Sequence, residues 1–227
     1  MRLGEVYGAL ATRLLGEFCP RCSLASAAGF CRACRADFPT VVQPCPRCGL
    51  PLGLAACPAA AAGWALSGVT APFVYAAPLS DHVKALKYQR RRTLGRALGL
   101  LLAERLDAGG RAVDALVPVP LHARRLRERS FNQADEIGRS LAKALDLRLL
   151  ARGIARQRAT PAQTGFGPAE RRRHLAGAFL VSRALTGLRI AIVDDVLTTG
   201  ATANALAAAL REAGAAQVEC WAVARTL

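Results

Sequence analysis

The chain of 227 residues has little of three things: lysine, aromatic side chains and uninterrupted apolar sequence. Aromatic residues make up 5% of the chain, which argues against an extended surface for stacking nucleic-acid bases. The long uncharged stretch at residues 48–80 contains four prolines and four glycines, whereas a membrane-spanning helix needs about 20 largely uninterrupted apolar residues. Residues 1–18 include Glu5 and Glu17 and lack a continuous apolar core, so no secretory signal is expected.

Basic side chains outnumber acidic ones by 31 to 16, and only Lys84, Lys87 and Lys143 are lysines. Residues 124–173 carry thirteen of the basic side chains. With its net charge of +15, the surface attracts polyanions such as nucleic acids, anionic lipids and metabolites with a pyrophosphate group. Because aromatic residues are few, we interpret the basic segment first as anion-site lining and solvated helix faces, and second as a DNA groove.

Seven of the eight cysteines lie between positions 19 and 57. A Cys-x-x-Cys pair places two thiolates on one metal ion, and two such pairs complete a tetrahedral zinc site. We expect the first zinc site at Cys19, Cys22, Cys31 and Cys34. A second set is incomplete, because Ala60 stands where a fourth ligand is expected, and it comprises Cys45, Cys48 and Cys57. A disulfide framework and paired redox thiols are the alternatives, and Cys220 is interpreted as a core residue.

Residues 1–18 are predicted to form an amphipathic helix that packs on the cysteine-rich module, with docking to a membrane surface or a partner as the alternative. The predicted organisation has two parts, an N-terminal helix and zinc-ribbon module at residues 1–66 and an α/β domain at residues 67–227. No transmembrane segment is expected. We expect a cytoplasmic location, with peripheral attachment to the inner face of the membrane as the alternative. The oligomeric state stays open.

Residues 190–202 form the most informative segment, in which an apolar strand runs into two acids and a hydroxyl- and glycine-rich turn. The apolar run at 190–193 predicts a strand that is buried on both faces of a parallel sheet and ends at Asp194 and Asp195. Ligands of open α/β sheets bind beyond the carboxyl ends of the strands. Gly200 allows close backbone approach, and the helix predicted at 203–210 offers unpaired N–H groups to a phosphate. The two acids suit sugar hydroxyls or a hydrated Mg²⁺.

This segment resembles the phosphoribosyl pyrophosphate (PRPP) signature of type I phosphoribosyltransferases. The alternative is an ordinary strand, turn and capped helix, which needs one capping residue rather than five. The competing phosphate motifs GxxxxGK[ST] and GxGxxG are absent. The resemblance implies an α/β fold with a parallel sheet flanked by helices, and PRPP bound together with Mg²⁺. The two acids are also expected to act in catalysis. The residues expected to bind PRPP here are Asp194, Asp195, Val196, Leu197, Thr198, Thr199, Gly200, Ala201 and Thr202.

The segments before the signature predict strands at 68–76 and 113–119 and helices at 80–88, 93–106 and 133–145, with Ser80 and Asn132 as caps. The second strand ends in a rigid turn that leads into arginines, which bind phosphate in bidentate fashion. Because the arginines follow a strand end, we favour an anion site over a solvated basic helix. The residues expected to hold pyrophosphate are Pro118, Val119, Pro120, Leu121, Arg125 and Arg129. Residues 156–168 predict either a loop that closes over a ligand or a surface linker.

Further motifs extend the resemblance over nearly the whole chain. In order, they are the Cys-x-x-Cys pairs, Leu86-Lys87-Tyr88, Pro118-Val119-Pro120, Arg129-Ser130-Phe131-Asn132-Gln133, Thr160 with Gln163, and the signature at 193–202. This combination is identified as that of the ComF family, phosphoribosyltransferase-like proteins with an N-terminal double zinc ribbon. Two positions depart from the family pattern: Ser130 replaces a usual glycine and His174 a usual asparagine.

The resemblance implies a protein that binds Mg²⁺ and PRPP and transfers the phosphoribosyl group to an acceptor that the sequence does not identify. It also implies structural Zn²⁺ and a role in DNA uptake during natural competence. The alternative is a non-catalytic protein that handles DNA or senses PRPP on the same scaffold. The partners implied are PRPP and either single-stranded DNA or proteins of the competence machinery.

Overall fold

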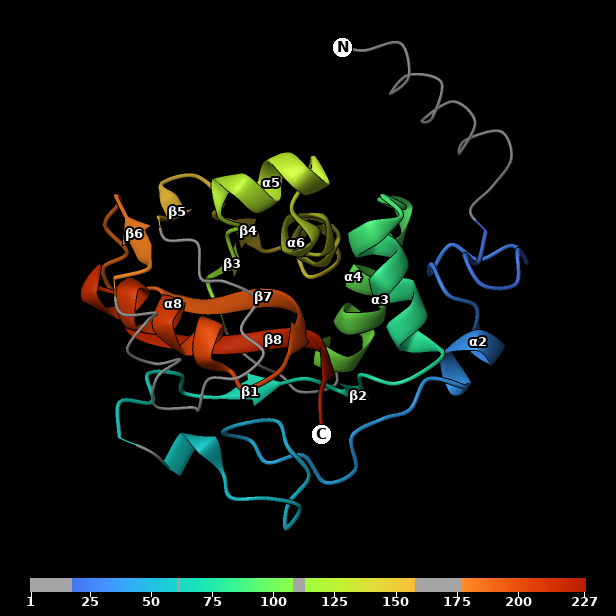
Figure 1. The fold of residues 1–227 in the computed structure, drawn as a ribbon, viewed down its shortest axis with the longest axis horizontal. Helices are drawn as coiled ribbons and strands as arrows, with labels where there is room; N and C mark the ends of the chain where they lie inside the picture. Colours follow the sequence, from blue (N-terminus) through green and yellow to red (C-terminus); the bar gives the residue numbers. More distant parts are fainter. Residues whose placement is uncertain (1–17, 61, 108–112, 158–176) are drawn as a thin grey trace.

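The computed structural model describes residues 18–60, 62–107, 113–157 and 177–227. The helix predicted at the N-terminus lies outside this part except for its last residue, and so does most of the loop predicted at 156–168. Figure 1 shows a central sheet with helices on both faces and the cysteine-rich segment along one side. The predicted α/β architecture, a parallel sheet flanked by helices with an N-terminal cysteine module, is confirmed.

Six strands form one parallel sheet in the order β1-β8-β7-β3-β4, with β2 also paired to β8. Its two long central strands are β7 (Arg189–Leu197) and β8 (Gln217–Arg225), whose apolar residues are buried except for the partly buried Val196. Burial on both faces explains why their sequences are continuously apolar. The shorter strands are β1 (Val69–Thr70), β2 (Phe73–Val74), β3 (Ala115–Pro118) and β4 (Arg148–Leu149).

Two layers cover the faces of this sheet, one made of helices and the other of a helix and a pair of short strands (Figure 1). The first layer consists of α3 (Leu79–Tyr88), α4 (Thr93–Asp107) and α6 (Gln133–Ala144). The opposite layer consists of α8 (Ala201–Glu212) and an antiparallel hairpin formed by β5 (Ile154–Arg156) and β6 (Phe179–Val181). Helix α5 (Ala123–Arg129) follows β3. The cysteine-rich segment contains α2 (Arg32–Ala36) and the short 3₁₀ helix η1 (Pro58–Ala60).

Two local predictions needed correction. The strand predicted at 68–76 is split into β1 and β2 around Pro72, because proline has no N–H to donate to the ladder with β8. Ser80 does not cap α3, which begins one residue earlier with Pro78 at the N-cap, so Ser80 lies buried in the first turn. The cap predicted at Asn132 is confirmed, since its side chain accepts a hydrogen bond from the N–H of Ala134.

The first part of the cysteine-rich segment packs on α3 and α4 through buried aromatic residues. The rings of Phe30 and Phe38 meet edge to face at 4.9 Å, and His82 of α3 lies 5.0 Å from Phe30. At Gly29 a Cβ atom would lie 2.8 Å from the Cα of Ala97, so only glycine permits this approach to α4. These residues share one apolar core with the sheet. The boundary predicted at residue 66 stays a prediction. Of the helices in the described ranges, none is long and apolar enough to cross a membrane.

Candidate functional site

Strand β7 is longer than predicted. It does not end at Asp194 and Asp195 but continues to Leu197, because Leu197 pairs with Arg225 of β8. On the other side, pairing with β3 stops at Pro118 opposite Val193. Asp194 and Asp195 therefore lie beyond the end of β3, where a ligand can approach the edge of β7.

Asp195 forms an ion pair with a lysine that the sequence analysis did not assign to the site. Its Oδ1 lies 2.9 Å from Nζ of Lys87 in α3, and the two side chains are 9% and 18% exposed. Burial opposes the charge on Lys87, but the carboxylates of Asp195 and Asp194 outweigh it and raise the lysine pKa. The pair thus places a permanently charged ammonium against the acids of β7.

Asp194 is held in a different environment from its neighbour. Burial raises its pKa, the charge of Asp195 adds to this effect, and the result is a pKa of about 7. Lys87 and Arg156 of β5 act in the opposite direction, and the N–H of Asp195 donates to Asp194 Oδ1 at 2.8 Å. A carboxyl group with such a pKa can gain or lose a proton near neutral pH when a cation or a hydroxyl group arrives.

The turn after β7 exposes a row of backbone donors. In the described part of the chain, the N–H groups of Thr198, Thr199 and Gly200 donate to no acceptor. They precede the N-terminus of α8, whose dipole also favours an anion. The N–H of Ala201 donates to Oγ1 of Thr199 at 3.3 Å, so one hydroxyl does act in the manner of a cap. That leaves the other donors available for a ligand.

Gly200 is required in this turn for two reasons. Its φ of +78° lies in the left-handed region, which strains any residue with a side chain. A Cβ atom there would also lie 2.8 Å from Cη2 of Trp64. Asn204 of α8 holds the same segment, since its Oδ1 accepts from the N–H of Ala65 at 2.6 Å and its Nδ2 donates to the carbonyl of Gly63 at 3.0 Å. The end of the cysteine-rich segment is therefore packed directly on the turn.

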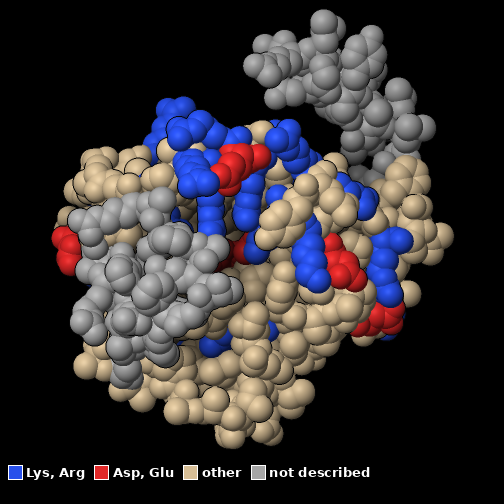
Figure 2. All heavy atoms as spheres, in the orientation of Figure 1, with Lys and Arg blue, Asp and Glu red and all other residues tan. Residues whose placement is uncertain are grey.

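A basic hollow of about 330 Å³ opens beside Lys87. It is lined by Lys87, Tyr88, Arg90, Arg125, Glu128 and Arg129. The guanidinium of Arg129 stacks 5.5 Å from the Tyr88 ring and donates to Gln133 at 2.9 Å. Figure 2 shows Lys and Arg side chains gathered over this part of the molecule. The hollow has the size and charge for a small polyanion.

The arginines that follow the rigid turn after β3 lie on the helix α5. Arg125 and Arg129 are four residues apart, and both are partly buried against the hollow. Arg124 and Arg127 are exposed. The anion-site interpretation therefore describes one face of this helix, which lines the hollow. The alternative, a solvated basic helix, describes the other face.

The rigid turn after β3 is braced by Asn132. While its Oδ1 caps α6, its Nδ2 donates to the carbonyl of Val119 at 2.9 Å. The N–H of Val119 in turn donates to the carbonyl of Val193 at 2.9 Å. The turn at Pro118, Val119, Pro120 and Leu121 is thus fixed to both β7 and α6, beside the acids. Ser130, in place of the usual glycine, ends α5 with a φ of +68°.

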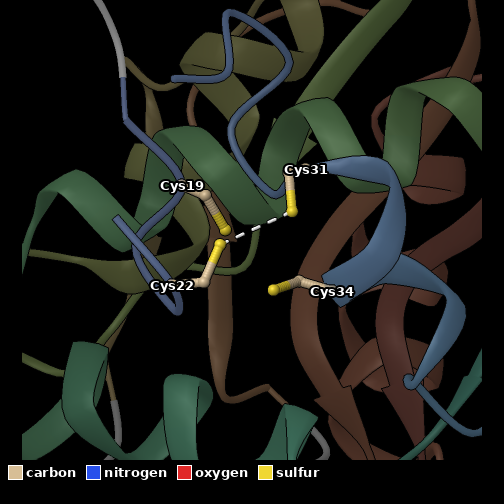
Figure 3. A group of neighbouring side chains, drawn as sticks. All are labelled: Cys19, Cys22, Cys31 and Cys34. Carbon is tan, nitrogen blue, oxygen red and sulfur yellow. Dashed lines mark hydrogen bonds between the residues drawn. The ribbon is translucent and has the colours of Figure 1, made fainter. Parts of the chain in front are cut away.

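The first cysteine cluster fits a zinc ion. The sulfur atoms of Cys19, Cys22, Cys31 and Cys34 lie within 4.8 Å of one another and point toward a common centre (Figure 3). The Cys22 and Cys31 sulfurs are 3.6 Å apart. Tetrahedral Zn–S bonds of about 2.3 Å put sulfurs about 3.8 Å apart, whereas a disulfide needs about 2.05 Å. Although burial opposes ionisation, backbone N–H groups lower the pKa of Cys19 to about 6.

The second cysteine cluster has three members that fit the same geometry. The sulfurs of Cys45, Cys48 and Cys57 lie within 4.8 Å of one another, and those of Cys45 and Cys57 are 3.9 Å apart. Both clusters could hold zinc, the second with one ligand fewer, as the sequence predicted. Cys220 is fully buried in the sheet, as expected.

Sequence reasoning missed several residues at the site, and for a common reason. Lys87 lies in a quoted motif, yet nothing in that motif pairs it with Asp195. Arg156, Trp64 and Arg225 carry no local signal, because their roles arise from contacts between distant segments. The guanidinium of Arg156 lies 5.6 Å from the centre of the Phe179 ring. The negative charge of Asp194 acts to raise the pKa of Arg156, against the effect of burial.

The relatives found by sequence comparison are DNA utilization proteins and a competence protein. No protein-family model matches the chain. It is 37% identical over 210 residues to DNA utilization protein YhgH of Salmonella typhimurium, covering 88% of this chain and 91% of the relative. The corresponding Escherichia coli K12 protein is 36% identical over 209 residues, with the same coverage. Competence protein F of Haemophilus influenzae is 33% identical over 159 residues, covering 66% of this chain and 69% of the relative.

Among solved structures, glutamine PRPP amidotransferase from B. subtilis is similar to 56% of this chain, with 22% identity and a TM-score of 0.39. Leishmania donovani UMP synthase is similar to 63%, with 17% identity and a TM-score of 0.37. The chain spans 25% and 29% of those longer proteins. The sequence relatives cover 66–88% of this chain and 69–91% of their own length, and on their identity and coverage the chain belongs to the ComF family.

Proposed function

We propose that this protein binds PRPP with Mg²⁺ at the carboxyl edge of β7 and transfers the phosphoribosyl group to an acceptor. One observation carries the proposal: a row of backbone N–H groups without a partner in the described residues, one buried and one partly buried acid, and a basic hollow adjoin one another along this edge. PRPP presents three matching groups, which are a 5-phosphate, ribose hydroxyls and a pyrophosphate.

The 5-phosphate would bind the turn at Thr198, Thr199 and Gly200. Three free N–H groups and the start of α8 supply donors without any loss of internal hydrogen bonds. The hydroxyls of Thr198, Thr199 and Thr202 would add further donors. Ala201 completes the turn at the first residue of the helix.

Pyrophosphate would lie between the turn after β3 and the basic hollow. Arg125 and Arg129 offer bidentate contacts, and Lys87 adds a point charge next to the acids. Mg²⁺, when bound, would neutralise charge on the pyrophosphate oxygens, and the carboxylates of β7 would accept hydrogen bonds from its water shell.

Asp194 and Asp195 would accept hydrogen bonds from the ribose hydroxyls. In the transfer, the bond between ribose C1 and the pyrophosphate oxygen breaks, pyrophosphate leaves with the electron pair, and a lone pair of the acceptor forms the new bond to C1. The acids stabilise positive charge on the ribose, and the arginines stabilise the leaving group. Catalysis of this kind is electrostatic and needs no covalent protein intermediate.

Transfer is tested by measuring pyrophosphate release from Mg²⁺ and PRPP in the presence of nucleobases and amines. Release that requires a particular acceptor and disappears in Arg125→Gln supports transfer. The matched control is Arg124→Gln, on the exposed face of the same helix. Tight PRPP binding without release for any acceptor would contradict transfer and leave binding alone.

A second candidate function is DNA binding without catalysis, with PRPP as a signal. The basic surface in Figure 2 favours it, as do the names of the relatives, DNA utilization protein and competence protein. Binding to single-stranded DNA that weakens steeply with added salt would support this function. DNA binding that is absent, or insensitive to salt, would contradict it. The cytoplasmic location and membrane attachment considered above stay predictions.

A further inference from the structure

Arg225, the last residue of β8, is a buried cation with an unusual set of partners. Only 2% of its surface is exposed, and in the described part of the chain its guanidinium donates to backbone carbonyl groups. Its Nη1 donates to the carbonyls of Leu197 at 2.9 Å and of Thr198, and its Nε donates to the carbonyl of Cys48 at 3.2 Å. A buried charge is costly unless it is fully hydrogen-bonded, so this arrangement fixes all of these carbonyls at once.

The contacts to Leu197 and Thr198 determine where the donors of the turn point. In a trans peptide the C=O and the following N–H point in opposite directions. Because Arg225 holds the carbonyls of Leu197 and Thr198, the N–H groups of Thr198 and Thr199 point away from it. Those are two of the three unpaired donors of the turn. Arg225 thus orients the donors from behind, without contacting the ligand.

The contact to Cys48 joins the same guanidinium to the second cysteine cluster, 177 residues away in sequence. The turn at residues 45–49 is packed tightly on the sheet. A Cβ at Gly49 would lie 2.9 Å from Cγ1 of Val69, and the N–H of Val69 donates to the carbonyl of Pro46 at 2.9 Å. A metal ion on Cys45, Cys48 and Cys57 would therefore fix the carbonyl that Arg225 uses.

We propose that Arg225 is a positioning residue that sets the donors of the phosphate-binding turn and couples them to metal occupancy of the three-cysteine cluster. The part concerning the ligand rests on the proposed PRPP site. Arginine suits this role because its planar fork reaches acceptors on separate segments, which a single ammonium or amide group cannot do. The coupling is reciprocal: metal binding tightens the anion site, and an anion tightens metal retention by the same factor.

The first test compares Arg225→Gln with Arg189→Gln, which removes an arginine from the opposite end of the same strand pair. We expect Arg225→Gln to weaken PRPP binding at least tenfold and Arg189→Gln to leave it unchanged. Amide exchange supplies a readout that needs no ligand, because the N–H groups of Thr226 and Asn204 donate to the carbonyls of Leu197 and Gly200. Exchange of these two amides should be at least tenfold faster in Arg225→Gln. Unchanged exchange in the folded variant would overturn the proposal.

The second test measures the coupling with a double-mutant cycle. Cys57→Ser removes a thiolate from the second cluster, and Cys22→Ser is the control in the first cluster. We expect Cys57→Ser to speed exchange at Thr226 and Asn204 at least fivefold, Cys22→Ser to have no such local effect, and Cys57→Ser to add nothing in the Arg225→Gln background. Equal effects of both cysteine variants, or additive effects with Arg225→Gln, would contradict the coupling. If the cycle holds but the wild-type protein binds no PRPP, the proposed function fails and the positioning role stands.

Discussion

Asp194 and Asp195 are neighbours in one strand, yet successive side chains of a strand point to opposite faces, and their surroundings differ accordingly. Asp195 meets Lys87 of the α3 layer, while Asp194 faces Arg156 of the hairpin in the other layer. Asp195 forms a direct ion pair with Lys87, while burial and the charge of Asp195 raise the pKa of Asp194 to about 7.

This raised pKa gives a stability prediction for Asp194→Asn. The folded protein binds a proton at Asp194 up to about pH 7, whereas the unfolded chain releases it near pH 3.8, so the native state binds more protons in between. Stability contributed by this group therefore falls as the pH rises from 4 to 7. Relative to wild type, we expect Asp194→Asn to gain about 1 kcal/mol or more in unfolding free energy between pH 4.5 and pH 8. Urea unfolding at both pH values measures this.

The control for that measurement is Asp81→Asn, which removes an exposed carboxylate of α3. Its effect on unfolding should be small and the same at both pH values. If Asp194→Asn shows an equally pH-independent effect, the carboxyl of Asp194 is ionised throughout, and the proposed burial of a neutral acid is wrong.

At the scale of elements, the start of α6 serves both as a helix cap and as a brace for the turn after β3. Asn132→Ala should cost about 1 kcal/mol through the lost cap. Asn132→Ser keeps a capping oxygen but lacks the amide NH₂ group that donates to the carbonyl of Val119. We therefore expect serine to restore most of the stability and little of the PRPP affinity, as measured by urea unfolding and calorimetry. Full recovery of affinity in Asn132→Ser would show that the brace is dispensable.

Helix α5 offers a comparison of two faces that carry the same charge. Arg125 and Arg129 line the hollow, while Arg124 and Arg127 face solvent. The double change to glutamine on the inner face should weaken PRPP binding at least tenfold, and the same change on the outer face should leave it within twofold. For single-stranded DNA, the outer pair should matter at least as much, because exposed charges neutralise phosphates without base contacts. Calorimetry and salt titrations distinguish the two faces.

Features that arise within one local segment were predictable from the sequence, whereas contacts between distant segments were not. Residues 190–202 fold within one strand, turn and helix, so their sequence predicts the acids, the glycine turn and the helix start. The cap at Asn132 was also predictable, because a capping side chain binds the N–H of a residue only two positions along the chain. In contrast, Lys87 with Asp195 and Arg225 with Cys48 are contacts between segments far apart in the chain, and no local pattern encodes them. The length of β7 likewise depends on its pairing with β8, which the sequence of β7 alone does not show.

For the whole molecule, the cysteine-rich segment and the sheet share a core, so metal loss should affect both. Phe30 and Phe38, next to the first cluster, pack with α3 and with Phe73 of β2. Removing zinc with a chelator should lower the thermal midpoint by at least about 5 °C in one cooperative transition. Scanning calorimetry checks this. Two separate transitions, with the upper one unmoved by the chelator, would show that the module melts independently.

Calorimetry with Mg²⁺ and PRPP tests whether the edge of β7 binds PRPP. We expect saturable binding of one PRPP per chain, abolished in the variant Asp194→Asn with Asp195→Asn and retained in Asp81→Asn. Binding of equal affinity in the double variant, or no binding by the folded wild-type protein, would contradict it.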